Sequence, residues 1–311
     1  MVAGGKAAVD RGQIERFLAT CIDVLASEGT RAALKDPASG RPGRKIVELQ
    51  QGVWDDLGVP AEAGRSAVGG IEKNFPEDHA ALVSLRDDFA KAADAAYLRC
   101  LEDRRPPALE NKAKMPRAIV LEFFDACSLM LDTPEVRERL RISVAEKGAM
   151  PDAVVNEVHG EVMELLGFEA AHGQSCFEEL GKANEFWKDR EVAVGYARWR
   201  GKTSSICLRL LNEYRKMGGE LHVDDEVKEK LLELQAKDEL DAMSVDERAQ
   251  LLERNAKKVN VFRGLPDEGR RRYLERLSDQ EKVELAKSEI LMVTLMQAQQ
   301  RMAHDAASRA E

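Results

Sequence analysis

The chain has 311 residues, of which 44% are apolar and 33% charged, and its formal net charge is −9. This composition is typical of a globular protein of about two domains and excludes a disordered chain. The negative charge argues against a protein whose whole surface binds nucleic acid, but a local basic patch remains compatible with it. Aromatic residues make up only 5%, and helix-favouring residues dominate, without hairpin signals. The sequence therefore predicts an all-α fold.

Neither a secretory signal nor a myristoylation signal is recognisable in the N-terminal segment MVAGGKAAVDRG. The longest apolar run, at residues 290–296 (ILMVTLM), is far shorter than the ~20 residues of a membrane span. The cysteines are odd in number and widely spread, so we expect buried reduced thiols rather than a disulfide framework. They are Cys21, Cys100, Cys127, Cys176 and Cys207. We expect an intracellular protein, cytoplasmic or nuclear, with no membrane segment.

Two segments of the chain are nearly the same. Residues 53–66 read VWDDLGVPAEAGRS and residues 162–175 read VMELLGFEAAHGQS. The matches continue on both flanks with small shifts of register, pairing Phe17 with Phe123, Cys21 with Cys127, Phe89 with Trp199 and Leu101 with Leu211. The sequence therefore predicts two tandem copies of one helical unit, at 10–105 and 116–217, joined by a linker at 106–115.

The repeated phrase is typical of the end of a helix. Gly58 and Gly167 each follow an apolar helical stripe, where a left-handed residue is easiest for glycine. Gly64 and Gly173 come six residues later, where we expect a positive φ or a close helix approach. A phosphate-binding loop is disfavoured because no strand precedes these glycines and no Gly-Lys-Ser/Thr follows.

Other helix boundaries are readable from capping residues and prolines. Thr133-Pro134-Glu135 predicts a helix over 134–147 that ends at Gly148. Residues 35–44 (KDPASGRPGR) are typical of a loop, and Arg105-Pro106-Pro107 cannot continue a helix. Gly218-Gly219 is expected to end the second copy.

The remaining residues, 224–303, predict a charged helical tail module with shorter helices. Capping boxes at Ser244/Glu247 and Ser278/Glu281, together with Pro266, place helices at about 246–259, 266–277 and 279–301. The last of these is apolar around most of its circumference at 290–296. Two interpretations remain open: this segment is buried in a core, or it is free for a partner helix.

Part of the second copy resembles a known domain. An apolar helix at 119–131 is followed by Thr133-Pro134-Glu135, by the Arg-rich stretch RERLRI at 137–142, and by ELLGFE at 164–169. In this order, residues 116–175 resemble the PUB domain of peptide N-glycanase and related ubiquitin-pathway adaptors. That family expects an asparagine soon after the Arg-Ile pair, where this chain has Ser143, Val144 and Ala145. The resemblance implies an adaptor that binds the C-terminal tail of a hexameric ATPase.

Candidate catalytic groups are sparse. His172 and Cys176 are four residues apart, but a zinc site needs further ligands and none stands at a suitable spacing. The adjacent acids Glu178 and Glu179 point apart on a helix and do not form an acid–base pair. Without a nucleophile motif or a dinucleotide fingerprint, we expect a non-catalytic protein with no metal and no cofactor.

A local cluster of basic residues interrupts the acidic chain between positions 254 and 276. The candidate partner-binding residues are Lys257, Lys258, Arg263, Arg270, Arg271, Arg272 and Arg276. They fit either a solvated helix face or a docking surface for an acidic protein, a phosphate or RNA. The favoured hypothesis is a protein–protein interaction scaffold with an unidentified protein partner; the alternative is binding of RNA or another nucleic acid through residues 254–276.

Overall fold

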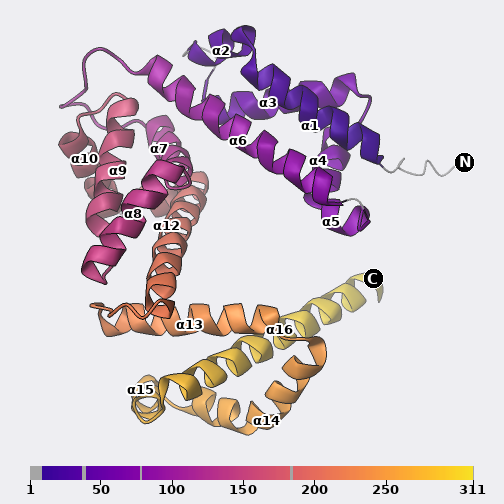
Figure 1. The fold of residues 1–311 in the computed structure, drawn as a ribbon, viewed down its shortest axis with the longest axis vertical. Coiled ribbons are helices and arrows are strands. Elements are labelled where there is room, and N and C mark those ends of the chain that lie inside the picture. Colours follow the sequence, from indigo (N-terminus) through magenta and orange to yellow (C-terminus); the bar gives the residue numbers. More distant parts are fainter. Residues whose placement is uncertain (1–8, 37–39, 78, 183–184, 311) are drawn as a thin grey trace, which may run out of the picture. The chain divides into compact units, whose positions relative to one another are not determined.

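The computed structural model describes residues 9–36, 40–77, 79–182 and 185–310. Within these ranges the chain is helical and forms no strand, apart from an isolated parallel bridge between Glu110 and Phe168 (Figure 1). The predicted all-α fold is confirmed.

The chain forms two compact units. One comprises Met1–Glu138 and Ala153–Thr203, and the other comprises Arg139–Asp152 and Ser204–Glu311. The first unit therefore holds residues of both predicted copies, and the second holds the predicted tail module together with residues 139–152 and 204–217 of the second predicted copy. The boundaries at 10–105, 106–115, 116–217 and 224–303 stay predictions.

Each predicted copy contains helices of the same order. The first has α1 (Arg11–Ala26), α2 (Glu28–Lys35), α3 (Pro42–Asp56), α4 (Ala61–Gly69), α5 (Ile71–Asn74) and α6 (His79–Arg104). The second has α7 (Arg117–Met130), α8 (Pro134–Lys147), α9 (Asp152–Leu165), α10 (Ala170–Lys182), α11 (Glu185–Lys188) and α12 (Arg190–Lys216). In both, the fifth helix has four residues and the sixth is the longest, with 26 residues in α6 and 27 in α12.

Most of the predicted helix boundaries are confirmed. Helix α8 covers 134–147, the Thr133 hydroxyl accepts the Val136 amide hydrogen at 3.4 Å, and Gly148 follows with a φ of 58°. The loop predicted at 35–44 extended too far, because Pro42 takes the first position of α3, where its missing amide hydrogen costs nothing. The part of that loop at 37–39 lies outside the described residues.

The repeated phrase forms the same turn in both places. Gly58 has a φ of 67° and Gly167 a φ of 90°, so the expected left-handed helix stop is confirmed at each. The amide of Val59 then donates to the Trp54 carbonyl at 3.0 Å, and the amide of Phe168 donates to the Met163 carbonyl at 2.9 Å. These bonds satisfy carbonyls that the helix ends would otherwise leave unpaired.

Six residues beyond each turn, a glycine lets two helices approach closely. A Cβ atom at Gly64 would lie 2.4 Å from the Trp54 ring, and one at Gly173 would lie 2.7 Å from the Met163 sulfur. The positive φ that was the alternative for these two glycines is absent, because both lie inside helices. Close approach is therefore the physical reason for glycine here.

Aromatic side chains fill the core of the first unit. Phe17 stacks on Trp54 with ring centroids 3.7 Å apart and lies 6.1 Å from Phe89. Phe123, which the sequence match pairs with Phe17, lies 5.7 Å from Trp199, which the same match pairs with Phe89. The same aromatic contact between the first and sixth helices thus occurs in each predicted copy.

Among the described residues, four helices follow Gly219: the second and fourth are longer than the sequence indicates, the third is shorter, and the first was not predicted. They are α13 (Asp225–Ala242), α14 (Val245–Gly264), α15 (Asp267–Glu275) and α16 (Asp279–Ala310), the last with 32 residues. The predicted capping boxes are confirmed, since Ser244 and Glu247 cap each other and the Ser278 and Glu281 amides bond to the partner side chains at 2.9 and 3.4 Å. The prediction of shorter helices is wrong for α14 and α16 because solvated charged residues do not end a helix.

The apolar segment 290–296 of α16 is only partly covered. Ile290, Leu291 and Met292 are half-buried. By contrast, Leu295 is 49% exposed and Met296 is 44% exposed. The core interpretation therefore fails for the second half of the segment.

Replacing Gly64 with alanine should destabilise the protein by about 1–3 kcal/mol, because the added methyl group would overlap the buried Trp54 ring. Gly173→Ala should cost less, because the Met163 side chain can shift. Urea unfolding measures both changes.

Gly52→Ala and Gly201→Ala are the matched controls. Both glycines are exposed within helices and have nothing within 4 Å of a new Cβ. These variants should gain about 0.5–1 kcal/mol. If Gly64→Ala were as stable as Gly52→Ala, the close-approach explanation would be wrong.

Candidate functional site

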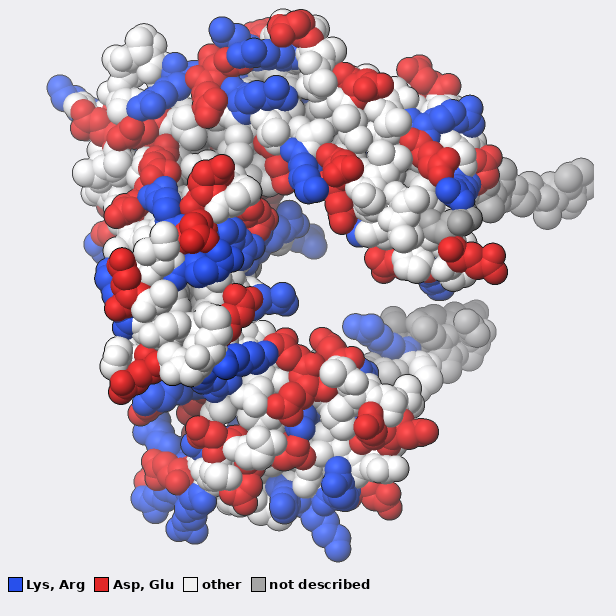
Figure 2. Space-filling model, viewed as in Figure 1, with Lys and Arg blue, Asp and Glu red and all other residues white. Residues whose placement is uncertain are grey.

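The predicted basic cluster lies on α14 and α15 of the second unit. Five of its members are exposed: Lys257, Lys258, Arg271, Arg272 and Arg276. Of these, Arg272 forms an ion pair with Glu268 at 2.5 Å. Figure 2 shows basic side chains interspersed with acidic ones over the visible face of the protein.

Two members of the cluster serve the packing of the unit itself. Arg270 donates from Nη2 to the carbonyl of Arg263 at 2.8 Å, and its guanidinium lies 5.9 Å from the centre of the Phe262 ring. Arg263 contacts the sulfur of Met296 at 3.4 Å. Charge reversal at Arg270 would therefore disturb folding as well as charge, and it makes a poor test of binding.

The aromatic residues near this cluster do not face solvent as a stacking platform. Phe262 is 7% exposed and packs against the half-buried Tyr273 with ring centroids 5.7 Å apart. Single-stranded nucleic acid is usually held by exposed rings on which bases stack. Neither Phe262 nor Tyr273 is exposed in this way.

A groove of about 690 Å³ lies on the second unit, between the end of α12 and helices α13, α15 and α16. Apolar side chains in its lining are Leu221, Leu231, Leu232 and Leu274. Charged side chains in its lining include Arg271, which belongs to the predicted cluster. The sequence did not indicate this groove, because its leucines have the spacing of ordinary core residues.

The charges around the groove are only partly neutralised. Lys228 pairs with Asp225 at 3.0 Å, and Lys282 pairs with Asp279 at 3.4 Å. Arg271 is exposed and forms no ion pair with the described residues. An apolar surface beside an available guanidinium can bind an apolar side chain next to a carboxylate.

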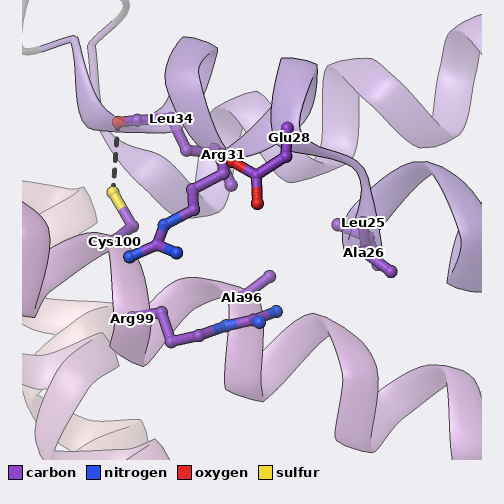
Figure 3. A pocket seen from close by; sticks show the side chains of 8 residues that line it. All are labelled: Leu25, Ala26, Glu28, Arg31, Leu34, Ala96, Arg99 and Cys100. Atoms are coloured by element: carbon purple, nitrogen blue, oxygen red, sulfur yellow. Dashed lines mark hydrogen bonds between the residues drawn. The ribbon is translucent and has the colours of Figure 1, made fainter.

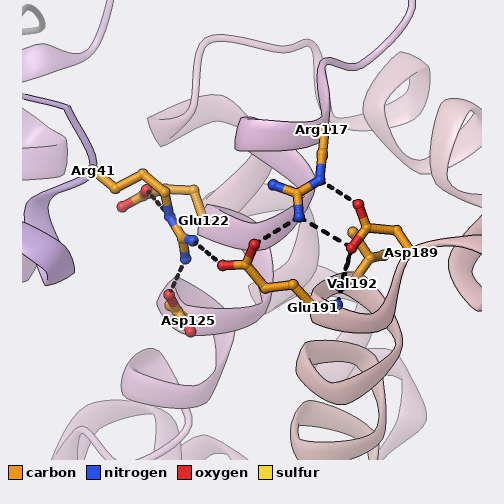
Figure 4. Close-up of polar contacts among 7 residues, drawn as sticks. All are labelled: Arg41, Arg117, Glu122, Asp125, Asp189, Glu191 and Val192. Atoms are coloured by element: carbon orange, nitrogen blue, oxygen red, sulfur yellow. Dashed lines mark hydrogen bonds and ion pairs between the residues drawn. The ribbon is translucent and has the colours of Figure 1, made fainter.

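A second charged cluster connects α3, α7 and α12 within the first unit (Figure 4). Arg41 reaches Asp125 at 2.5 Å, and Glu122 and Glu191 at 3.4 Å each. Arg117 pairs with Asp189 at 2.5 Å and with Glu191 at 2.6 Å. Glu191 thus links the two arginines, and residues of both predicted copies meet here. A cavity of about 250 Å³ adjoins the cluster, with Arg117 and Asp189 in its lining.

Glu122 is the buried member of this cluster. Its side chain is 7% exposed and accepts a hydrogen bond from the Tyr97 hydroxyl at 2.5 Å. Burial raises the pKa of Glu122 above its usual value of 4.5, and the Tyr97 bond and Arg41 oppose that rise. The Arg117 guanidinium instead lowers the pKa of Asp189 to about 2. Because the carboxylates are held by arginines, the cluster is built to join helices rather than to transfer protons.

The histidine and cysteine that the sequence singles out do come together, but not as a catalytic pair. The Nε2 atom of His172 lies 3.6 Å from the sulfur of Cys176 and 2.9 Å from the carbonyl oxygen of Ala113. A carbonyl only accepts, so Nε2 carries the proton and cannot act as a base for the thiol. Among the described residues, no group of three or more His, Cys, Asp and Glu side chains could hold a metal ion.

A small cavity of about 40 Å³ lies between α1, α2 and α6 (Figure 3). The Cys100 thiol borders it and donates to the Leu34 carbonyl at 3.1 Å, and burial raises the pKa of this thiol. A space of this size holds about one water molecule. All five cysteines are free and buried, as expected.

Comparison of the chain with protein-family models, with curated proteins and with solved structures gives no match. No helix in the described part of the chain is long and apolar enough to cross a membrane.

Replacing Glu122 with glutamine should change how stability depends on pH. Because the pKa of Glu122 is raised in the folded state, protonated Glu122 stabilises the folded protein at pH values below 4.5. This contribution is lost as the pH rises from 4.5 through the pKa that Glu122 has in the folded state. The glutamine keeps an acceptor for Tyr97 and removes the titration. The stability of Glu122→Gln relative to the unmodified protein should therefore rise with pH, as measured by urea unfolding at a series of pH values.

Asp189→Asn is the control of opposite sign. Because the pKa of Asp189 is lowered in the folded state, its carboxylate stabilises the folded protein at pH values above 3.8. This contribution is lost as the pH falls toward 2. The Asn variant should be the less stable protein at neutral pH, with a gap that closes on acidification. Parallel pH profiles for Glu122→Gln and the unmodified protein would contradict the assignment of Glu122.

Proposed function

We propose that this chain is a non-catalytic interaction protein, and that the groove on the second unit binds a short segment of a partner protein. The observation that carries the proposal is the groove itself: about 690 Å³ of space, apolar in part, bordered by α13, α15 and α16. Its volume suits several side chains of a peptide.

The chemistry of the groove indicates the kind of segment that fits. Leu231 is buried (1% exposed), whereas Leu232 is half-buried and still reaches solvent. Apolar side chains of the partner would cover the part of this leucine surface that solvent still reaches. Arg271 offers a planar pair of donors to a carboxylate. Because the lining also holds the acidic Glu229 and Glu275, the occupant that fits is a peptide with apolar side chains and a single acidic residue placed at Arg271.

We further propose that residues 10–105 and 116–217 are two copies of one helical unit and provide the scaffold. The shared order of helices, the left-handed Gly58 and Gly167, and the close approach at Gly64 and Gly173 support this duplication. The similarity of residues 116–175 to the PUB domain, with the adaptor role that it implies, stays a prediction.

RNA binding through residues 254–276 remains the second hypothesis, because Lys257, Lys258 and Arg276 are exposed outside the groove lining. Each contact between a basic side chain on such a face and an RNA phosphate adds to the binding affinity, and this affinity falls as the salt concentration rises. An RNA site would therefore depend on Arg276 as much as on Arg271, whereas a peptide in the groove would depend on Arg271.

Peptides selected from a phage-displayed random library on the full chain supply the probes, and fluorescence anisotropy measures their affinity. We expect Arg271→Glu to weaken binding by about tenfold or more, because it places a carboxylate against the acidic residue of the peptide. Leu232→Ala should also weaken binding, by removing apolar contact in the groove.

Arg276→Glu is the matched control, since Arg276 is exposed on the same segment but does not line the groove. It should leave peptide affinity unchanged. Binding of a labelled single-stranded RNA that both reversals weaken equally, with no selected peptide sensitive to Arg271→Glu, would replace the peptide proposal with the RNA hypothesis.

A further inference from the structure

The C-terminal part of α16 exposes large apolar side chains. Leu295 is 49% exposed, Met296 is 44% exposed and Met302 is 64% exposed. Surfaces of this kind in soluble proteins commonly mark an interaction site.

These residues extend a stripe that is already used for packing. Leu285, Ser288 and Met292 lie on the face of α16 that contacts α14: Leu285 and Met292 share a core cluster with Val259 and Phe262, and Ser288 accepts a hydrogen bond from Asn255 at 3.1 Å. Leu295, Gln299 and Met302 follow at alternating steps of three and four residues. This spacing keeps one face toward a neighbouring helix. The bare part of the stripe is therefore shaped for another helix.

The chemistry of the stripe limits what that helix can be. No Asp, Glu, Lys or Arg occurs from Ile290 to Gln300. A charged partner side chain placed on Leu295, Gln299 or Met302 would lose hydration without gaining an ion pair from these residues. Gln299, between Leu295 and Met302, carries both a donor and an acceptor, so its amide is complementary to its own copy.

We propose that this stripe binds the α16 helix of a second copy of the chain, forming a homodimer with paired helices. The two identical stripes bury Leu295 and Met302, and the Gln299 amides hydrogen-bond to each other. A two-fold pair needs only one such surface, because the same patch serves both copies. The dimer does not involve the groove lining, so it is independent of the proposed peptide site.

Sedimentation velocity of the full chain over a range of concentrations tests this proposal. We expect reversible self-association of the unmodified protein. Leu295→Glu should raise the dissociation constant by at least about tenfold, because it places two carboxylates in the apolar pair. Since Leu295 is already half exposed, the variant should keep its fold, which circular dichroism checks.

Gln297→Glu introduces the same charge on the opposite side of α16 from the stripe, where the residue is exposed. It should dimerise like the unmodified protein. A protein that is monomeric at all concentrations overturns the proposal. So does a Leu295→Glu variant that associates normally, or a Gln297→Glu variant that dissociates equally.

Discussion

The close approach of two helices at a glycine is the constraint on which the first unit depends. At Gly64 the backbone of α4 lies directly against the Trp54 ring, and at Gly173 the backbone of α10 lies against Met163. In each case the preceding helix has just ended at a left-handed glycine, so the turn directly precedes the helix that makes the close contact. The turn reverses the chain, and the missing side chain lets the next helix lie down on the one before it. The aromatic layer of Phe17 and Phe123 is packed around the helix pairs so formed.

Charged and polar side chains connect the helices that these apolar contacts bring together. Arg41 and Arg117 bridge carboxylates from α7 and from the start of α12, and the buried Glu122 is held by Tyr97 from α6. Removing one member of a buried pair lowers the free energy of unfolding by more than the intact pair contributes to it, because the remaining polar group stays buried without a partner. The cluster is thus a joint between helices. The groove in the second unit differs, because there Arg271 remains available beside apolar surface.

The sequence was informative where a local rule fixes the backbone. Glycines after apolar stripes, Pro134 at the start of α8 and the Ser244/Glu247 box each act over a few residues, and the structure places them as expected. The lengths of α14 and α16 were underestimated because charged composition does not end a helix. The groove and the Arg41 cluster could not be predicted, since their members come from helices far apart in the chain and meet only through packing.

The basic cluster illustrates the same limit at single residues. Composition treats Arg270 and Arg271 alike, yet Arg270 caps the Arg263 carbonyl and covers the Phe262 ring, while its neighbour lines the groove. Adjacent positions on a helix point in different directions, so only the fold tells a packing cation from an available one.

Hydrogen exchange at two backbone amides tests the central claim, that the repeated phrase forms one turn used twice. The amide of Val59 and the amide of Phe168 each donate to the carbonyl five residues earlier, and both side chains are buried. The account predicts that both amides exchange slowly in the native protein and are similarly protected. Rapid exchange at one of them, with protection retained at the other, would show that the two segments are not equivalent and would contradict the account.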